Sequence, residues 1–154
     1  FIYQLYRPDV MEERTKILLD LHIPLTKFTN FIHPSVMLAK TAQIGYGNVL
    51  LANVVVNSGA KLGNFNTVNS FALIGHDCII GDNNYFAGHI SVGSGMTVGN
   101  KNFVGVNSSL KNGITIGDRN IVGMLSNVTK SLGDDMIVYG NPAKPVEKLN
   151  HIIR

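Results

Sequence analysis

Five histidines are the side chains of this 154-residue chain best suited to moving a proton near neutral pH, because imidazole titrates at about pH 6.5. They are His22, His33, His76, His89 and His151. His76 precedes Asp77, and a carboxylate beside an imidazole can fix its tautomer and raise its basicity. The pair is therefore a candidate general base. The alternative is an exposed histidine without a role beside an aspartate that serves a turn.

A six-residue repeat must position these side chains. From Ile32 to Val128 every sixth residue is large and apolar, and the fourth residue after it is mostly small or narrow, as at Ala60 and Ala72. A period of six does not keep one face of an α-helix, and a single strand does not run this far. Short strands joined by corners fit the pattern, with three sides and roughly eighteen residues in each coil.

The repeat predicts an all-β parallel β-helix over residues 32–133, with a tail over residues 134–154. Residues 1–31 lack the repeat. Asp9 and Glu12 resemble a capping box, and Pro24 can end a helix, so we expect an amphipathic helix over about residues 9–22. Val10, Met11, Ile17, Leu18 and Leu21 would form its apolar face, and we expect this helix to cover the open end of the β-helix.

Composition excludes several classes of protein. Apolar residues make up 45% of the chain, but no stretch is long enough to span a membrane as a helix. The net charge of +3 is small and the Lys and Arg residues are scattered, which argues against a nucleic-acid partner. The single cysteine, Cys78, fits a reducing cytoplasm and occupies a small-residue position, so we interpret it as core rather than nucleophile.

The segment 69–82, which contains His76 and Asp77, resembles the active-site coil of bacterial sugar acetyltransferases. These include the sialic acid O-acetyltransferases and the UDP-4-amino-sugar N-acetyltransferases of surface glycan pathways. Residues 105–108 and the ending 128–145, with its Gly-Asn-Pro-Ala-Lys run, are similar to the same family. The resemblance covers about residues 31–146. It implies a left-handed parallel β-helix of hexapeptide repeats and a homotrimer with active sites between subunits.

The resemblance also implies roles for particular residues. His76 would be the general base and Asp77 the acid that raises its basicity. Acetyl-CoA would be the co-substrate, with no metal, and the acceptor would be the amine or hydroxyl of a nucleotide-linked sugar near Asn69. The family's CoA lies along positions that match Tyr85, Gly105, Val106 and Met124, and Lys130 and Lys144 could meet its phosphates.

Two features depart from the family's pattern. The family often has a second histidine where this chain has Tyr85, although a tyrosine can still donate a hydrogen bond. Close relatives also carry an N-terminal nucleotide-sugar-binding βαβ domain, whereas residues 1–31 resemble only its last helix and linker.

Three alternatives remain at this stage. The first is a β-helix scaffold without catalysis, and the second is an acyl-carrier-protein-dependent acyltransferase, which usually carries a helical C-terminal domain. The third is a γ-class carbonic anhydrase, which needs a His-x₄-His pair among its three zinc ligands. The histidines of this chain do not have that spacing.

Overall fold

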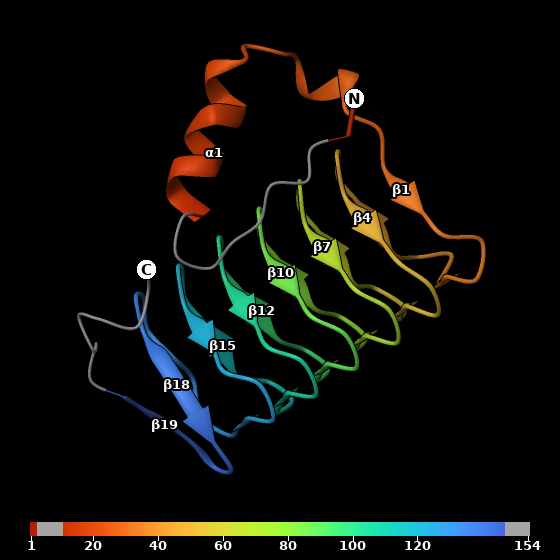
Figure 1. The fold of residues 1–154 in the computed structure, drawn as a ribbon. Helices are drawn as coiled ribbons and strands as arrows, with labels where there is room; N and C mark the ends of the chain where they lie inside the picture. Colours follow the sequence, from red (N-terminus) through yellow and green to blue (C-terminus); the bar gives the residue numbers. More distant parts are fainter. Residues whose placement is uncertain (3–10, 147–154) are drawn as a thin grey trace.

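A parallel β-helix dominates the computed structural model, which describes residues 1–2 and 11–146 (Figure 1). One α-helix, α1 (Met11–Asp20), and a short 3-10 helix, η2 (Leu25–Lys27), precede it. The strands are β1 (Phe31–Ile32), β2 (Met37–Leu38), β3 (Gln43–Ile44), β4 (Val49–Leu50), β5 (Val55–Val56), β6 (Lys61–Leu62), β7 (Thr67–Val68), β8 (Leu73–Ile74), β9 (Ile79–Ile80), β10 (Tyr85–Phe86), β11 (Ser91–Val92), β12 (Thr97–Val98), β13 (Phe103–Val104), β14 (Ser109–Leu110), β15 (Thr115–Ile116), β16 (Ile121–Val122), β17 (Asn127–Val128), β18 (Ile137–Gly140) and β19 (Ala143–Pro145).

The strands stack in three sheets, one for each side of the prism. Sheet A has the order β1-β4-β7-β10-β13-β16-β18-β19, sheet B has β17-β14-β11-β8-β5-β2, and sheet C has β15-β12-β9-β6-β3. From β1 to β14 each strand pairs in parallel with the third strand after it, so that Phe31 lies beside Val49 and Tyr85 beside Phe103. The 18-residue coil that the sequence predicted is therefore confirmed.

The apolar repeat forms the core because the second residue of each short strand points inward. Leu50, Ile74, Phe86 and Val104 are fully buried in this way, while the first residue of most strands faces outward. The expected inward positions from Ile32 to Val128 are all second residues of strands β1 to β17, which confirms the assignment.

Each coil turns at three corners, and these corners carry the candidate site. The A–B corner, between sheets A and B, consists of residues 33–36, 51–54, 69–72, 87–90, 105–108 and 123–126. The B–C corner consists of residues 39–42, 57–60, 75–78, 93–96 and 111–114, and continues after β17. The C–A corner consists of residues 45–48, 63–66, 81–84, 99–102 and 117–120.

A buried ladder of asparagines holds the coils together at the C–A corner. Its members are Asn48, Asn66, Asn84, Asn102 and Asn120, all fully buried. The Asn84 amide donates to the Gly99 carbonyl at 2.8 Å, and its oxygen accepts the Asn102 backbone N–H at 2.9 Å. Each rung thus satisfies backbone groups that would otherwise be buried without partners.

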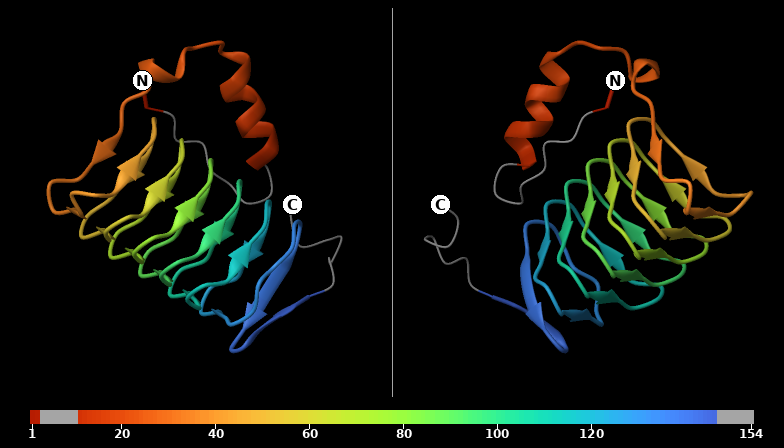
Figure 2. Two further views of the ribbon diagram at one scale, coloured as in Figure 1. Left: turned by 180° about the vertical axis from the view of Figure 1, so that it is seen from behind. Right: turned by 45° about the vertical axis from the view of Figure 1, so that its right-hand side comes forward.

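Helix α1 lies beside the C–A corner and does not cover the end of the β-helix, so the expected position of the helix is wrong. Both views in Figure 2 show α1 alongside the coils. Leu18 packs with Phe28 and Phe65 in a small separate core, which fixes the helix on this flank. Of the expected apolar face, Ile17 and Leu21 are exposed, while Val10 lies outside the described residues.

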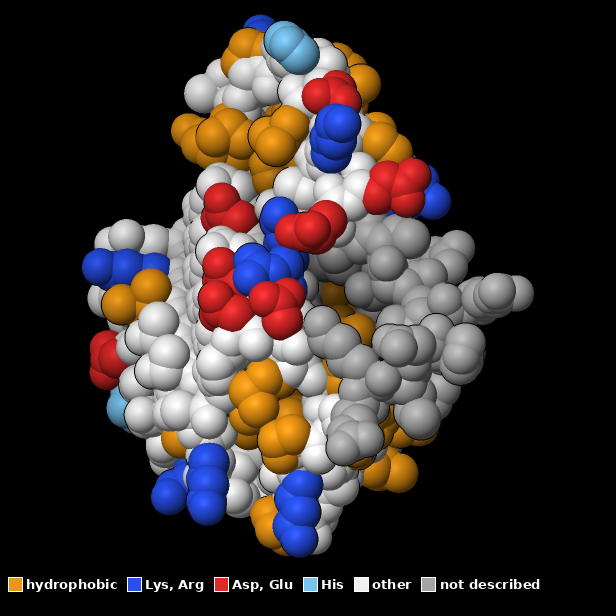
Figure 3. Space-filling view, turned by 90° about the vertical axis from the view of Figure 1, so that its left-hand side faces the viewer, with side chains coloured by type: hydrophobic (Ala, Val, Ile, Leu, Met, Phe, Trp, Pro, Cys, Tyr) orange, Lys and Arg blue, Asp and Glu red, His pale blue; other side chains and the backbone are white. Residues whose placement is uncertain are grey.

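Charged side chains gather where α1 meets the C–A corner (Figure 3). Glu12 pairs with Lys101 at 3.3 Å. Arg119 binds Asp135 through two hydrogen bonds of 2.8 Å and lies 3.8 Å from Asp134. Because α1 lies on this flank, the first coil keeps exposed inward residues, with Ile32 at 40% and Leu38 at 39%.

The six-residue register ends after Val128, but the solenoid continues beyond residue 133, the predicted end of the β-helix. Strand β18 adds to sheet A in parallel with β16, and Ile137 pairs with Ile121. This last coil is shorter, at 137 − 121 = 16 residues, and β19 then folds back antiparallel on β18. Among the described residues no helix has the length and apolar character needed to cross a membrane.

Candidate active site

His76 and Asp77 form a hydrogen-bonded pair on the B–C corner, directly after strand β8. His76 Nδ1 lies 2.8 Å from Asp77 Oδ2. A carboxylate only accepts hydrogen bonds, so Nδ1 carries the proton and donates it, which leaves the Nε2 lone pair free to accept another. The two side chains are 59% and 71% exposed, so a substrate can reach them.

The turn itself aims the pair outward. Asp77 has a positive φ of 57°, a conformation that aspartate tolerates better than most residues. Its backbone N–H donates to the Ser58 carbonyl of the preceding coil at 2.9 Å. The His76 carbonyl in turn accepts the Gly95 N–H of the next coil at 2.8 Å. The backbone of the pair is therefore fixed from both neighbouring coils.

Cys78 completes the same turn but points into the core. It is fully buried and its thiol lies 3.0 Å from the Gly93 carbonyl. Burial raises the pKa of this thiol, because the charged thiolate loses its hydration, so the reactive form is disfavoured. The interpretation of Cys78 as a core residue is confirmed.

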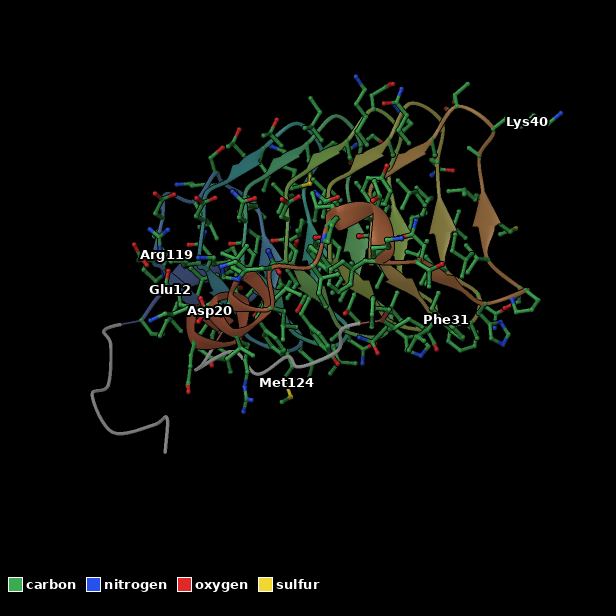
Figure 4. All side chains as sticks on the ribbon, turned by 90° about the horizontal axis from the view of Figure 1, so that it is seen from above. Glu12, Asp20, Phe31, Lys40, Arg119 and Met124 are labelled. Atoms are coloured by element: carbon green, nitrogen blue, oxygen red, sulfur yellow. The ribbon has the colours of Figure 1, made fainter. Side chains whose placement is uncertain are left out.

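A second group of predicted residues gathers on the A–B corner. Asn69, Gly105, Val106 and Met124 belong to the turns 69–72, 105–108 and 123–126 of this corner, and Val106 and Met124 are 38% and 65% exposed. Gly105 allows the coils to approach closely, since a Cβ there would lie 2.5 Å from the Met124 backbone nitrogen. Met124 projects outward from the β-helix (Figure 4).

The remaining predicted residues lie apart from both groups. Tyr85 is on sheet A, where its ring stacks on Phe103 with 5.3 Å between the ring centroids. Lys130 follows β17 on the B–C side, and Lys144 belongs to β19 opposite Tyr139. Both lysines are exposed. Within one chain, the A–B corner group and the His76–Asp77 pair lie on opposite edges of sheet B.

Sequence reasoning missed one feature near this site. Phe71 and His89 stack at the A–B corner, with 4.9 Å between their ring centroids and 10° between their planes. Both occupy the turn position with positive φ, at 62° and 57°. The sequence did contain a signal for this stack. Phe71 and His89 occupy the turn position that Asn53 and Asn107 occupy in the neighbouring coils.

The chain matches no protein-family profile and no curated protein sequence, but solved structures resemble it closely. A variant of perosamine N-acetyltransferase from Caulobacter crescentus, in complex with CoA and GDP-perosamine, superimposes with a TM-score of 0.83 at 27% identity over 89% of this chain. The acetyltransferase domain of PglB from Neisseria gonorrhoeae gives 0.79 at 26% identity over 90%. The chain spans 65% and 66% of the length of these two proteins.

WeeI from Acinetobacter baumannii shares the fold, with a TM-score of 0.62 at 24% identity over 90% of this chain and 66% of its own. The PglB domain has also been crystallised with acetyl-CoA. In two of the Caulobacter structures a histidine has been replaced, once by asparagine and once by alanine. The chain is thus a left-handed parallel β-helix of hexapeptide repeats, similar in structure to bacterial sugar acetyltransferases.

Proposed function

We propose that this chain is an acetyl-CoA-dependent acetyltransferase that acetylates an amine or hydroxyl of a nucleotide-linked sugar. The observation that carries the proposal is the exposed His76–Asp77 pair, in which the 2.8 Å hydrogen bond leaves Nε2 as a free base. The likeness to a perosamine N-acetyltransferase that was crystallised with CoA and GDP-perosamine supports the choice of substrates.

His76 acts as the general base. The acceptor nitrogen or oxygen attacks the thioester carbonyl carbon of acetyl-CoA, and a bond forms between them while Nε2 takes the acceptor's proton. Asp77 stabilises the imidazolium that results. The tetrahedral intermediate then collapses, the carbon–sulfur bond breaks, and the CoA thiolate takes the proton from His76. No acyl-enzyme is required, in keeping with the buried thiol of Cys78.

The exposed side of the A–B corner receives CoA. Val106 and Met124 present apolar surface that suits the pantetheine arm, and they lie below the coil of His76 along the axis of the prism. Lys130 and Lys144, near the C-terminal end of the β-helix, are exposed cations that can meet the phosphates. Tyr85 contributes to the site through its phenol group. In this arrangement the thioester reaches the level of His76.

A homotrimer completes each site. Asn69 and Met124 lie on one edge of sheet B, whereas His76 lies on the other edge of the same sheet. A single chain therefore does not bring the base to the acceptor and CoA residues. Packing around a three-fold axis places the B–C corner of one subunit against the A–B corner of the next, and this joins the two half-sites.

The test is acetyl transfer from acetyl-CoA, followed by thiol release, with a panel of UDP- and GDP-linked amino sugars. We expect His76→Ala to lower kcat at least a hundredfold, the usual contribution of a general base being about 10²–10⁴-fold, while CoA binding by calorimetry is unchanged. His33→Ala is the matched control, because His33 lies on the first coil, away from the pair, and should keep wild-type activity.

Two results would contradict the proposal. One is a wild-type protein that does not bind CoA, which would favour the non-catalytic scaffold. The other is an active enzyme in which His76→Ala keeps the wild-type rate, which would leave the fold as the only similarity to the acetyltransferases.

A further inference from the structure

The Phe71–His89 stack is an exposed aromatic surface that contacts inside the chain do not explain. Phe71 is 55% exposed, and His89 is exposed on the coil below it. Within residues 1–2 and 11–146, neither ring nitrogen of His89 has a hydrogen-bond partner, and the one ring contact of His89 is Phe71. The exposed parts of the Phe71 ring and of the His89 ring are thus available to a ligand.

These two residues are also unfavourable choices for their turn. From residue 47 to residue 125 the third residue of each corner turn has a positive φ, which asparagine and glycine adopt more easily than a bulky side chain. Asn53 and Asn107 occupy this position in the coils on either side of the stack. A ring at Phe71 therefore weakens the turn without adding buried contacts in return.

Phe65 shows what a structural reason for such a ring looks like. It has the same type of turn position, with a φ of 56°, but it is only 5% exposed. It packs edge-on against Phe28, with 4.9 Å between the ring centroids, and also against Leu18 of α1. Phe71 has no such buried partner among the described residues, so burial does not explain its ring.

The stack lies at the level where the acceptor is expected. Phe71 and His76 belong to the same coil, and Phe71 stands two residues after Asn69 on the A–B corner. Val106 and Met124 continue this corner toward the C-terminal end, where the CoA arm is placed. In the proposed trimer the stack therefore lies at about the level of the base of the adjoining subunit.

The geometry points to the Phe71–His89 stack as the surface that holds a ring of the acceptor, and this inference rests on the proposed acetyltransferase function. The ligand chemistry is a ring with an apolar face and polar substituents. The Phe71 ring packs against its apolar part, and the free nitrogens of His89 hydrogen-bond its polar groups. Either the sugar or the nucleobase of a nucleotide-linked sugar has this chemistry.

The experiment compares Phe71→Asn with Phe65→Asn. Asparagine suits a positive φ, so Phe71→Asn should leave the melting temperature unchanged or raise it. It should also raise the acceptor KM roughly tenfold, the scale of one lost stacking contact, with the KM for acetyl-CoA unchanged. Phe65→Asn should show the reverse pattern, a lower melting temperature with an unchanged acceptor KM, because its ring is buried under α1.

Calorimetry on the His76→Ala protein separates the two sources of the ring without turnover. GDP, UDP and a free 4-amino sugar are titrated with and without Phe71→Asn, and the ligand whose affinity falls identifies the ring. His89→Asn should weaken the same ligand. A change in the nucleoside diphosphate points to the base, and a change in the free sugar points to the pyranose.

Three results would overturn the inference. The first is an active Phe71→Asn enzyme with the wild-type acceptor KM. The second is a Phe71→Asn protein that sediments as a monomer, which would make Phe71 a subunit-packing residue. The third is equal binding of every ligand with and without the substitution. These results are distinct from a failure of the acetyltransferase proposal, in which the wild-type protein itself would release no CoA with any acceptor.

Discussion

Gly59 lies one coil before Asp77 on the B–C corner, and it has no room for a side chain because the Asp77 carboxylate occupies that space. A Cβ built on Gly59 would collide with Asp77 Oδ1. Gly59 also has a φ of +71°, which disfavours any L side chain there. The position of the acid next to His76 thus depends on a missing methyl group in the neighbouring coil.

We expect Gly59→Ala to displace Asp77 from His76 Nδ1. The tautomer of the imidazole is then no longer held, and kcat should fall by about tenfold or more, with little change in the KM for acetyl-CoA. Steady-state kinetics at saturating acceptor measure this effect. Gly95→Ala is the control, because Gly95 has a similar φ of +64° but open space around its Cβ position. Equal loss in both variants would show that backbone strain, rather than the Asp77 contact, is responsible.

Cys78→Ala tests whether the thiol takes part in catalysis. The variant should keep kcat within about twofold and lose about 1 kcal/mol of unfolding free energy, since one buried heavy atom is removed. Urea unfolding and initial rates measure the two quantities. A collapse of kcat in a folded Cys78→Ala protein would instead indicate a covalent thiol mechanism.

The same thiol predicts how stability changes at alkaline pH. Burial raises the pKa of Cys78, so the native state holds this proton more tightly than the unfolded state does. The stabilisation from this group is complete below the ordinary thiol pKa of 9.0 and declines as the pH rises above that value. The difference in urea midpoint between wild type and Cys78→Ala should therefore narrow between pH 8 and pH 10, roughly one unit on either side of that value. A constant difference would show that ionisation of the thiol does not contribute.

Asn84→Ala should destabilise the β-helix by about 2–4 kcal/mol, because it leaves the Gly99 carbonyl and the Asn102 backbone N–H without their partners in a buried corner. Asn112→Ala is the matched control. Its oxygen accepts the Ser94 backbone N–H at 3.0 Å in an exposed turn, where water can replace it, so the loss should stay below about 1 kcal/mol. Urea unfolding of the two variants measures both losses of unfolding free energy. Similar losses would show that the stabilisation by the asparagine ladder does not depend on its burial.

Mixed oligomers test whether the active site is shared between subunits. His76→Ala and Met124→Asp each disable a different edge of sheet B, so each variant alone should be inactive. In a cyclic trimer that contains both, one of the three junctions joins an intact His76 to an intact Met124. Equal co-expression should therefore recover about a quarter of the wild-type activity. No recovery, in a preparation shown to contain mixed trimers, would place the whole site within one chain.

Much of the fold could be predicted from the sequence because large apolar residues recur at every sixth position, where the β-helix needs an inward side chain. An inward position accepts only a large apolar residue, so the repeat from Ile32 to Val128 identifies strands β1 to β17, whereas β18 and β19 lie beyond it. The pairing of His76 with Asp77 was also accessible, because the two residues are adjacent in a turn and the repeat places His76 at an outward position. Both predictions use information that lies within a few residues along the chain.

The position of α1 and the aromatic stack could not be obtained in the same way. An amphipathic pattern shows that a helix buries one face, but the contact of Leu18 with Phe65 joins distant segments and leaves no periodic trace. Phe71 and His89 are eighteen residues apart, so their contact follows from the register. Their significance appears only when the exposed rings are compared with the buried ring of Phe65.

The constant 18-residue register means that two positions on one corner are separated along the axis by a whole number of coils. Deleting six residues between His76 and Met124 would transfer every downstream side chain to a different corner, and the site would be lost. Deleting a whole coil would keep each residue on its corner and shorten the distance between them by about 4.8 Å, the spacing of neighbouring strands. The length of thioester arm that such a scaffold accepts can therefore change only in steps of one coil.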